Sequence, residues 1–256
     1  HLSIRRQRQM CIRDSAYPGM ETPALEDVSF KIDPGERVAI IGKVGSGKST
    51  IARLILGLYP PSQGNVLVDG TDLRQFDKPT LRRLVGAALQ ESVLFSGTIR
   101  ENITLGREDL SDEEMLAAAR TAGADAFMSR LANGYDRHLV DRGESLSGGQ
   151  RQAIALARAL AGDPPVVVLD EPTSQMDAET ESAVIASIDK ELAGRTLLVI
   201  THRTPFLSMV DRIIVVDSGK VVADGSRDEI VARLNGGRKT ADTSKGGFVT
   251  TRGIRR

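Results

Sequence analysis

A glycine-rich segment at residues 42–49 has the residue types of a phosphate-binding loop. It fits the pattern G-x-x-x-x-G-K-[ST], and it lies between a β-branched run, Arg37–Ile41, and a helical pattern at residues 50–58. Glycines let the backbone curve until successive N–H groups point at phosphate oxygens, and the positive end of the next helix faces the same oxygens. We therefore expect Lys48 to reach β- and γ-phosphates and Ser49 to ligate Mg²⁺.

The nucleotide-binding residues predicted here share this loop and the first helical turn after it. They are Gly42, Val44, Gly45, Ser46, Gly47, Lys48, Ser49 and Thr50. A glycine-rich turn without a ligand is the plain alternative. The strand before and the helix after the loop favour phosphate binding, because the pattern requires that context.

Two adjacent carboxylates, Asp170 and Glu171, follow the apolar run at residues 166–169. Side chains alternate in direction along a strand, so the two carboxylates leave it in different directions. We assign Asp170 to Mg²⁺ and Glu171 to polarising the attacking water, because phosphoryl transfer needs charge neutralisation and positioning. A strand end with two solvated acids is the alternative for this segment alone, and the presence of Lys48 makes that alternative weaker.

The elements that must position these motifs alternate along the chain. Strands are predicted at residues 37–41, 65–70, 166–169, 196–200, 212–217 and 220–224, and helices at 50–58, 150–161 and 178–192. Strand, helix and strand in repeated order imply right-handed crossovers and a largely parallel sheet with ligand sites at the carboxyl ends of its strands. The region at about 81–132 is mostly helical in pattern, with Ser111 as a capped helix start.

Composition excludes several classes of protein. The 256 residues are 40% hydrophobic and 27% charged, which is typical of a globular chain and excludes collagen, coiled coil and wholesale disorder. No run approaches the roughly 18–20 apolar residues of a membrane helix. The single cysteine, Cys11, excludes an intramolecular disulfide framework and predicts a reducing, cytoplasmic setting. Residues 17–234 carry 24 basic against 32 acidic side chains, which argues against a nucleic-acid-binding face there.

A further motif, which a generic phosphate-binding domain does not need, is the pentapeptide Leu146-Ser147-Gly148-Gly149-Gln150. It resembles the signature of the ATP-binding cassette (ABC) family. Gln90, residues 170–174, Asp177 and the pair Thr201-His202 fall in the order of that family's motifs. The resemblance implies an α/β P-loop NTPase fold with a mostly parallel sheet core, an antiparallel β subdomain and an inserted helical (signature) subdomain.

The resemblance also implies roles for single residues. Tyr17 corresponds to the aromatic residue that stacks on adenine, with a buried core tyrosine as the alternative. Gln90 corresponds to the residue that contacts Mg²⁺ and the attacking water, with an exposed loop glutamine as the alternative. His202 corresponds to the switch histidine that bonds the γ-phosphate and orients Glu171, with a structural histidine as the alternative.

The signature implies a partner. Its residues expected to contact the γ-phosphate of the partner subunit's ATP, or to support that contact, are Ser147, Gly148, Gly149 and Gln150. A helix that starts at this glycine pair presents a free positive end that attracts an anion. A head-to-tail dimer of two cassettes with two sandwiched ATP molecules supplies that anion by symmetry. Asp177 is expected to couple the two sites, and Gln175 stands where the family more often has alanine.

Two segments indicate the kind of cassette. Residues 94–103 are similar to the exporter segment that forms part of the socket for the cytoplasmic helices of the membrane domain, and residues 141–144 resemble the exporter cross-linking loop. A loop and a helix cap without such a role are the alternative for either segment alone. Residues 176–177, 201–203 and 223–225 are most similar to type I protein-secretion exporters, in which the cassette follows six membrane helices on the same polypeptide.

The resemblance thus implies an ATPase that powers export from the cytoplasmic face of the cell (inner) membrane. Its cofactors are ATP and Mg²⁺, and its partners are a second cassette and a transmembrane domain, with no nucleic acid. Two alternatives stay open: a stand-alone cassette subunit of an importer, and a soluble ABC ATPase that acts on nucleic acid or the ribosome.

Three parts are expected along the chain. Residues 1–15 are interpreted as a head that lies outside the domain and need not be native sequence, and the chain as a fragment of a longer polypeptide. Residues 16–234 are the nucleotide-binding domain, with the helical subdomain at about 90–160. Residues 235–256 are rich in Gly, Thr, Lys and Arg and are expected to form a basic, disordered tail.

Overall fold

A six-stranded sheet forms the centre of the computed structural model, which describes residues 8–15, 24–91, 93–140 and 143–241. The strand order is β12-β11-β3-β10-β9-β6, and every neighbouring pair except β11–β12 is parallel. This confirms the predicted α/β fold with a mostly parallel core. The carboxyl ends of β3, β9 and β10 meet at one edge of the sheet, where ligands bind in such folds.

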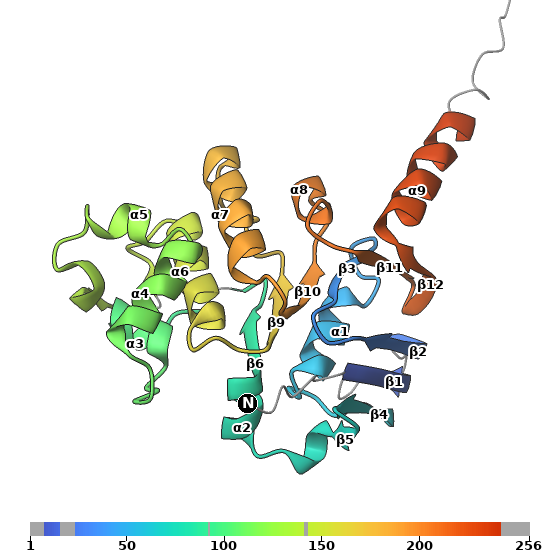
Figure 1. Ribbon diagram of the computed structural model, residues 1–256, viewed down its shortest axis with the longest axis horizontal. Helices are drawn as coiled ribbons and strands as arrows, with labels where there is room; N and C mark the ends of the chain where they lie inside the picture. Colours follow the sequence, from blue (N-terminus) through green and yellow to red (C-terminus); the bar gives the residue numbers. More distant parts are fainter. Residues whose placement is uncertain (1–7, 16–23, 92, 141–142, 242–256) are drawn as a thin grey trace, which may run out of the picture.

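The strands and helices alternate as the sequence predicts, with boundaries shifted by a few residues. The central sheet comprises β3 (Arg37–Ile41), β6 (Val85–Ala88), β9 (Val166–Asp170), β10 (Thr196–Ile200), β11 (Arg212–Asp217) and β12 (Lys220–Ser226). The helices around it are α1 (Lys48–Ile55), α2 (Lys78–Leu84), α6 (Gly148–Leu160), α7 (Ala178–Glu191), α8 (Thr204–Leu207) and α9 (Arg227–Ala241). Figure 1 shows α6 and α7 beside β9, with α1 under β3.

Alternate residues of the buried strands face two different hydrophobic clusters. In β9, Val167 and Leu169 pack with α6 and α7, whereas Val166 and Val168 pack with α1. The same alternation holds in β10 and β3, because side chains of a strand point to opposite faces in turn. Helices α1 and α6 therefore cover opposite faces of the sheet.

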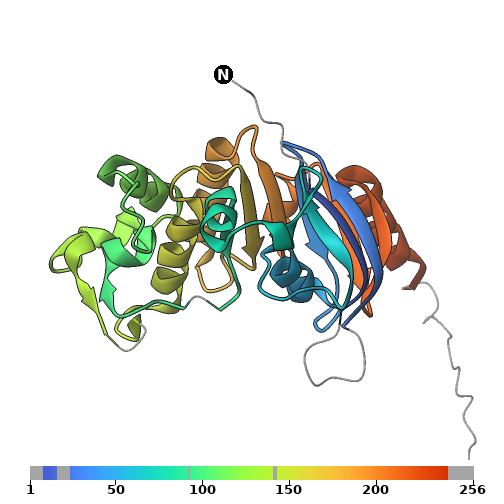
Figure 2. The ribbon, with the colours of Figure 1, turned by 90° about the horizontal axis from the view of Figure 1, so that it is seen from below.

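An antiparallel sheet closes the α1 side of the core. Its strand order is β2-β1-β4-β5, built from β1 (Arg8–Ser15), β2 (Leu25–Ile32), β4 (Gln63–Val68) and β5 (Thr71–Asp72). Apolar residues of β2 and β4, such as Phe30 and Val66, join the same cluster as α1. In Figure 2 the blue and teal strands of this sheet, the orange strands β11 and β12, and the red helix α9 follow one another as layers.

The expectation that residues 1–15 lie outside the fold is wrong for residues 8–15. They form β1, which pairs antiparallel with β2 from Arg8 opposite Ile32 to Ser15 opposite Leu25, and with β4 on its other side. The physical reason is that β2 and β4 are not neighbours, so a strand between them satisfies backbone groups that would otherwise lack partners. Alternation of side chains gives no signal in this segment, so only the pairing reveals it.

The C-terminal helix α9 extends further than the sequence suggests. The expected tail begins at residue 235, but the helix continues to Ala241 because adding residues to a formed helix costs far less than starting one. Residues 242–256 lie outside the described residues. None of the helices within the described ranges is long and apolar enough to cross a membrane.

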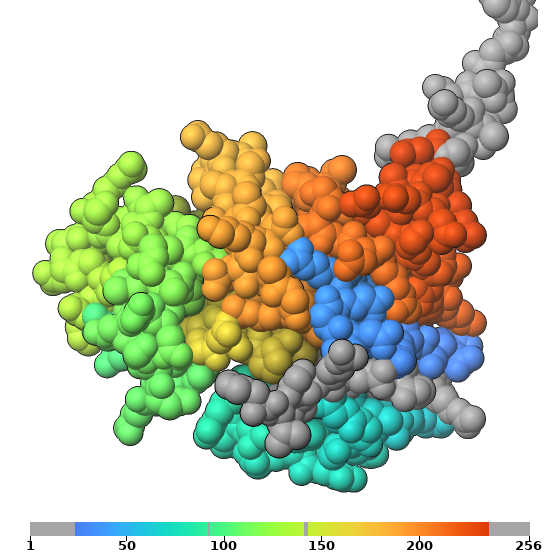
Figure 3. All heavy atoms as spheres, viewed as in Figure 1, coloured from blue at the N-terminus to red at the C-terminus, as the bar shows by residue number. Residues whose placement is uncertain are grey.

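The helical subdomain forms one end of the molecule, shown in green in Figure 3. It contains β7 (Gly97–Thr98), α3 (Ile99–Thr104), α4 (Asp112–Thr121), α5 (Asp125–Met128), a 3-10 turn (Gly134–Asp136) and β8 (His138–Leu139), and α6 joins it to the sheet. Another 3-10 turn, Leu73–Gln75, lies outside this subdomain, between β5 and α2. Ser111 caps α4 through a capping box with Glu114, as predicted. The inserted helical subdomain is thus confirmed.

Arg158 of α6 fastens this subdomain to the segment that follows β6. Its guanidinium donates to the Asn102 carbonyl at 2.7 Å, to Asn102 Oδ1 at 3.1 Å and to the Val93 carbonyl at 2.9 Å. Its Cζ lies 5.4 Å from the centre of the Phe95 ring. Burial lowers the pKa of the guanidinium to about 10. The single guanidinium of Arg158 therefore links α6 to α3 and to the segment that follows β6.

Replacing this guanidinium by a single ammonium should weaken the subdomain. Arg158→Lys keeps the charge, but one ammonium cannot reach all three acceptors, so we expect the free energy of unfolding to fall by about 2–4 kcal/mol. Urea unfolding measures the change. Arg100→Lys is the matched control, since Arg100 makes half-exposed ion pairs with Asp112 and Asp136 and should change stability by less than about 0.5 kcal/mol. Equal losses in the two variants would contradict this role of Arg158.

Candidate ATP-binding and hydrolysis site

The glycine-rich loop joins β3 to α1 and turns back on itself at its end. Gly47 is the N-cap of α1 with a φ of 101°, a conformation that side chains rarely adopt. A Cβ there would lie 2.5 Å from Leu25 Cδ2 and 2.9 Å from the Ala24 carbonyl oxygen. The loop can therefore enter α1 at this angle only with glycine, and the free N–H groups of the first helical turn face the loop.

Lys48 is the first residue of α1, and its side chain folds back onto the start of the loop. Its ammonium donates to the carbonyl oxygens of Gly42 at 2.8 Å and Lys43 at 2.7 Å. Burial lowers the pKa of Lys48, and the charges of Glu171 and Asp170 oppose part of that shift. The Lys48 ammonium and the carboxylates of Asp170 and Glu171 therefore share one electrostatic environment at the end of β9, as the sequence predicts.

Two other loop residues differ sharply in their surroundings. Ser46 is buried, and within the described residues its hydroxyl has no hydrogen-bond partner. Val44 is fully exposed at the loop tip. A buried hydroxyl without a partner costs free energy unless a ligand satisfies it, and a phosphate oxygen fits that need.

Asp170 is the last residue of β9 and is almost completely buried. Burial raises the pKa of its carboxyl, and a hydrogen bond with the Ser49 side chain offsets part of the shift. A carboxylate and a hydroxyl side by side are the hard oxygen donors that Mg²⁺ prefers. The predicted metal residues Ser49 and Asp170 therefore lie together and fit the ion.

Glu171 follows directly and has a different environment. Its side chain is 11% exposed, and its Oε1 lies 2.6 Å from His202 Nδ1 and accepts from the His202 backbone N–H at 3.2 Å. The Thr201 hydroxyl donates to Oε2 at 3.4 Å. His202 is mostly exposed, so its ring bridges the buried carboxylate and the surface. The predicted pairing of Glu171 with His202 is present, and Thr201, which the sequence analysis names only as part of a motif, is an additional partner of the carboxylate.

A second carboxylate, Glu181, ties the segment after His202 to the segment after Glu171. It accepts from the Thr173 hydroxyl at 2.5 Å and from Arg203 Nη1 at 2.7 Å, and Arg203 also donates to the Ser174 carbonyl at 3.2 Å. Burial would raise the pKa of Glu181, but the hydrogen bonds from Thr173 and Arg203 outweigh it and lower the pKa. The sequence did not predict this network, because Glu181 belongs to no motif and the bonds join residues that lie 8 to 29 positions apart.

The signature residues form the N-terminus of α6. Ser147 is the N-cap; its hydroxyl oxygen accepts from the Gln150 N–H at 3.2 Å, and its own N–H donates to Gln150 Oε1 at 2.9 Å. A Cβ on Gly148 would lie 2.1 Å from Gln175 Oε1, and one on Gly149 would lie 3.0 Å from the Gln175 carbonyl oxygen. Gln175 therefore packs directly on this glycine pair.

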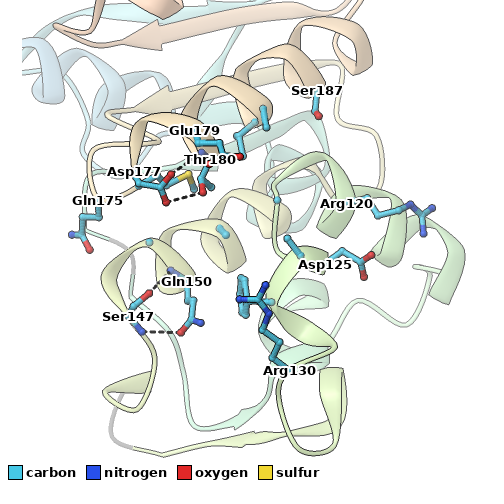
Figure 4. A pocket seen from close by; sticks show the side chains of 18 residues that line it. Arg120, Asp125, Arg130, Ser147, Gln150, Gln175, Asp177, Glu179, Thr180 and Ser187 are labelled. Carbon is cyan, nitrogen blue, oxygen red and sulfur yellow. Dashed lines mark hydrogen bonds between the residues drawn. The ribbon is translucent and has the colours of Figure 1, made fainter.

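A cavity of about 820 Å³ borders the signature. It is lined by Ser147, Gly149 and Gln150 of the signature, by Gln175 and Asp177, and by residues of α5 and α7. Figure 4 shows Asp177 beside Thr180, to whose N–H its Oδ1 is bonded at 2.9 Å. Asp177 is thus the N-cap of α7, and bonds from the N–H and hydroxyl of Thr180 lower its pKa. Its predicted coupling role stays a prediction.

Two further predicted site residues are Gln90 and Tyr17. Gln90 is exposed just after β6, the strand next to β9, so it lies at the same edge of the sheet as Asp170 and Glu171. Tyr17 lies outside the described residues, as do residues 141 and 142 of the expected cross-linking loop. Their assigned roles stay predictions.

Similarity to known proteins identifies the family of this chain. The family described as ABC transporter matches residues 25–174. The chain belongs to the ABC transporter family. It is therefore an ATP-binding domain with ATPase activity, and the prediction of ABC fold and enzyme class is confirmed.

Several ABC proteins are similar over most of this chain. An uncharacterized ABC transporter ATP-binding protein of Bacillus subtilis (strain 168) is 41% identical over 207 residues, which are 81% of this chain and 34% of that protein. A putative multidrug export ATP-binding/permease protein of Staphylococcus aureus (strain NCTC 8325 / PS 47) is 39% identical over 85% of this chain and 38% of that protein.

Among solved structures, a bacterial Atm1-family ABC exporter with ATP bound superposes with a TM-score of 0.85 and 35% identity, covering 96% of this chain and 43% of that one. The chain thus spans little more than a third of the curated relatives it matches. The names of these three proteins do not mention type I secretion.

Removing the charge of Glu181 tests the network around Arg203. Glu181→Gln should lower the free energy of unfolding at pH 7 by about 1–3 kcal/mol, because a charged acceptor of two hydrogen bonds is lost. The folded-state pKa of Glu181 lies below its unfolded value, so its stabilisation is present above about pH 4 and is lost as pH falls through the folded pKa. Urea unfolding of both proteins from pH 7 to pH 3 checks this. A difference that stays constant or grows toward pH 3 would contradict it.

Proposed function

We propose that this chain is the ATP-hydrolysing part of a membrane exporter. The observation that carries the proposal is the meeting of the phosphate loop, Asp170, and the Glu171–His202 pair at one edge of the sheet. Export is supported by the relatives, which include a putative multidrug export ATP-binding/permease protein and an Atm1-family ABC exporter.

The chain's own residues divide the work of hydrolysis. Lys48 and the loop N–H groups bind the phosphates, and the Ser46 hydroxyl gains an acceptor there. Ser49 and Asp170 would hold Mg²⁺, which when bound neutralises phosphate charge. Glu171 polarises a water whose oxygen bonds to the γ-phosphorus as the bond to the bridging oxygen breaks, giving ADP and inorganic phosphate. His202 keeps the Glu171 carboxylate in place and reaches toward the γ-phosphate.

A second cassette completes the site in this proposal. Helix α6 begins with exposed or half-buried signature residues and lies on the face of the sheet opposite α1, which carries the phosphate loop. Its positive end is an anion site that the chain's own loop does not cover from that face. A head-to-tail dimer brings the loop of one copy to the signature of the other, with Asp177 at the interface.

A membrane domain on the same full-length polypeptide is the other proposed partner. Phe95 and Leu105 are large apolar side chains that are 53% and 51% exposed. Leu105 borders a cavity of about 640 Å³ whose lining includes Arg82, Arg107 and Arg158. Exposed aromatic and arginine side chains are enriched in protein interfaces, which supports a contact here. The site would lie at the cytoplasmic face of the cell membrane.

The cargo class is proposed at a coarser level. Multidrug export and Atm1-family export are the activities that the relatives' names give, and they support an exporter without a defined cargo. Type I protein secretion, the subfamily that residues 176–177, 201–203 and 223–225 suggest, stays a prediction.

Removing one carboxylate tests the hydrolysis proposal. Glu171→Gln should bind Mg-ATP with an affinity close to wild type but hydrolyse it at least about 100-fold more slowly, because the group that polarises the water is lost. Gel filtration with ATP should then show a stable dimer, which the wild type forms only transiently. Hydrolysis at the wild-type rate would overturn the role of Glu171, and an ATP-bound monomer would overturn the dimer.

Sequencing the source DNA upstream of the codon for Tyr17 tests the membrane partner. The reading frame should continue into about six segments of roughly 20 apolar residues each. A start codon within a few dozen residues would instead favour a separate cassette subunit, as in importers.

A further inference from the structure

Gln152 lies one turn inside the signature helix α6 and is 2% exposed. Its Nε2 donates to the Glu171 carbonyl at 2.8 Å and to the Ser174 hydroxyl at 3.1 Å. Its Oε1 accepts from the Gln175 N–H at 2.9 Å. All three bonds therefore end on the short segment between β9 and α7, which begins with the residue proposed to polarise water.

Glu171 has an unusual main chain. Its φ is 51°, in the left-handed region that residues other than glycine seldom occupy, at a cost of about 1–2 kcal/mol. Its N–H donates to the Ile200 carbonyl at 2.9 Å, and its own carbonyl accepts from Ser174 N–H at 3.3 Å as well as from Gln152. Such a conformation persists only where its surroundings hold it.

We propose that Gln152 is a positioning residue for hydrolysis, which holds the left-handed main chain of Glu171 so that its carboxylate faces His202 and the attacking water. The inference rests on the proposed role of Glu171. Gln152 also belongs to the helix whose first residues form the signature, so a shift of α6 on engaging the partner's nucleotide reaches Glu171 through one buried amide. Arg158, further along the same helix, contacts other segments.

Two substitutions distinguish the hydrogen bonds of the Gln152 amide from the volume that its side chain fills. Gln152→Met fills the space but removes all three bonds, whereas Gln152→Glu keeps the acceptor for Gln175 and loses the donor to the Glu171 carbonyl. We expect kcat per bound ATP to fall by about 10–100-fold in both, because a displacement on the order of 1 Å misplaces the carboxylate. KM should stay within about threefold, because the phosphate loop is untouched.

Two control variants identify what the loss means. Gln75→Met makes the same change at an exposed position, and Thr121→Val removes a buried hydroxyl that donates within α4, to the Ala117 carbonyl. Both should keep the wild-type kcat per bound ATP, even where Thr121→Val lowers stability. Should Gln152→Met not fold, Gln152→Glu decides the matter.

A double-mutant cycle with Glu171→Gln distinguishes an effect on Glu171 from a general loss of structure. If Gln152 acts through Glu171, then Gln152→Glu should leave the slow residual hydrolysis of Glu171→Gln unchanged within about twofold, in single-turnover measurements on bound, γ-labelled ATP. Independent, multiplying losses would overturn the inference, as would wild-type turnover in folded Gln152→Glu. Wild-type turnover in Glu171→Gln alone would instead overturn the proposed function.

Discussion

The hydrogen bond from the Glu171 N–H to the Ile200 carbonyl is the constraint on which the site depends. It extends the β9–β10 ladder one residue beyond the paired Asp170 and Ile200. Because the two strands are parallel, both chains leave the sheet at the same edge, and the residues after Ile200 meet those after Asp170. The contacts of Thr201 and His202 with the Glu171 carboxylate follow from this register. A slip of one residue would turn the Asp170 carboxyl away from Ser49 and bring a neighbouring side chain to its place.

The two faces of the sheet carry different tasks. On one face, α1 and the antiparallel sheet build the core beneath the phosphate loop; on the other, α6, α7 and the helical subdomain share a second core. Because neighbouring residues of β9 belong to different hydrophobic cores, this strand lies between the two cores and contributes side chains to both. Side-chain bonds from Gln152 of α6, and from Glu181 of α7 to Arg203, join the loops that follow β9 and β10. The polar groups of these loops are therefore satisfied by one another, which is what allows so many of them to be buried.

The sequence was sufficient for the fold and for the residues of contiguous motifs. The glycine-rich loop, the carboxylates at the end of β9 and the signature are local patterns with a local physical cause, and short apolar or β-branched runs predicted β3, β9, β10, β11 and β12 to within two residues. The sequence was not sufficient for β1, because residues 8–15 show no alternation of apolar and polar side chains and form a strand by pairing with β2 and β4. It also passed over Gln152, Glu181 and Arg203, whose longer-range partners lie 19 to 29 residues away in the sequence. Such contacts depend on how helices cross the sheet, and a single sequence does not show them.

The left-handed backbone of Glu171 sets stability against activity. Glycine would adopt this conformation freely, and asparagine more readily than glutamate, so either would relieve strain at the end of β9. Both would remove the carboxylate beside His202. With the role proposed for Glu171, selection for thermal robustness alone would enrich variants of low turnover at this position, whereas selection for turnover must tolerate a locally strained backbone. Any attempt to evolve a hardier version of this domain needs a screen for hydrolysis at every round.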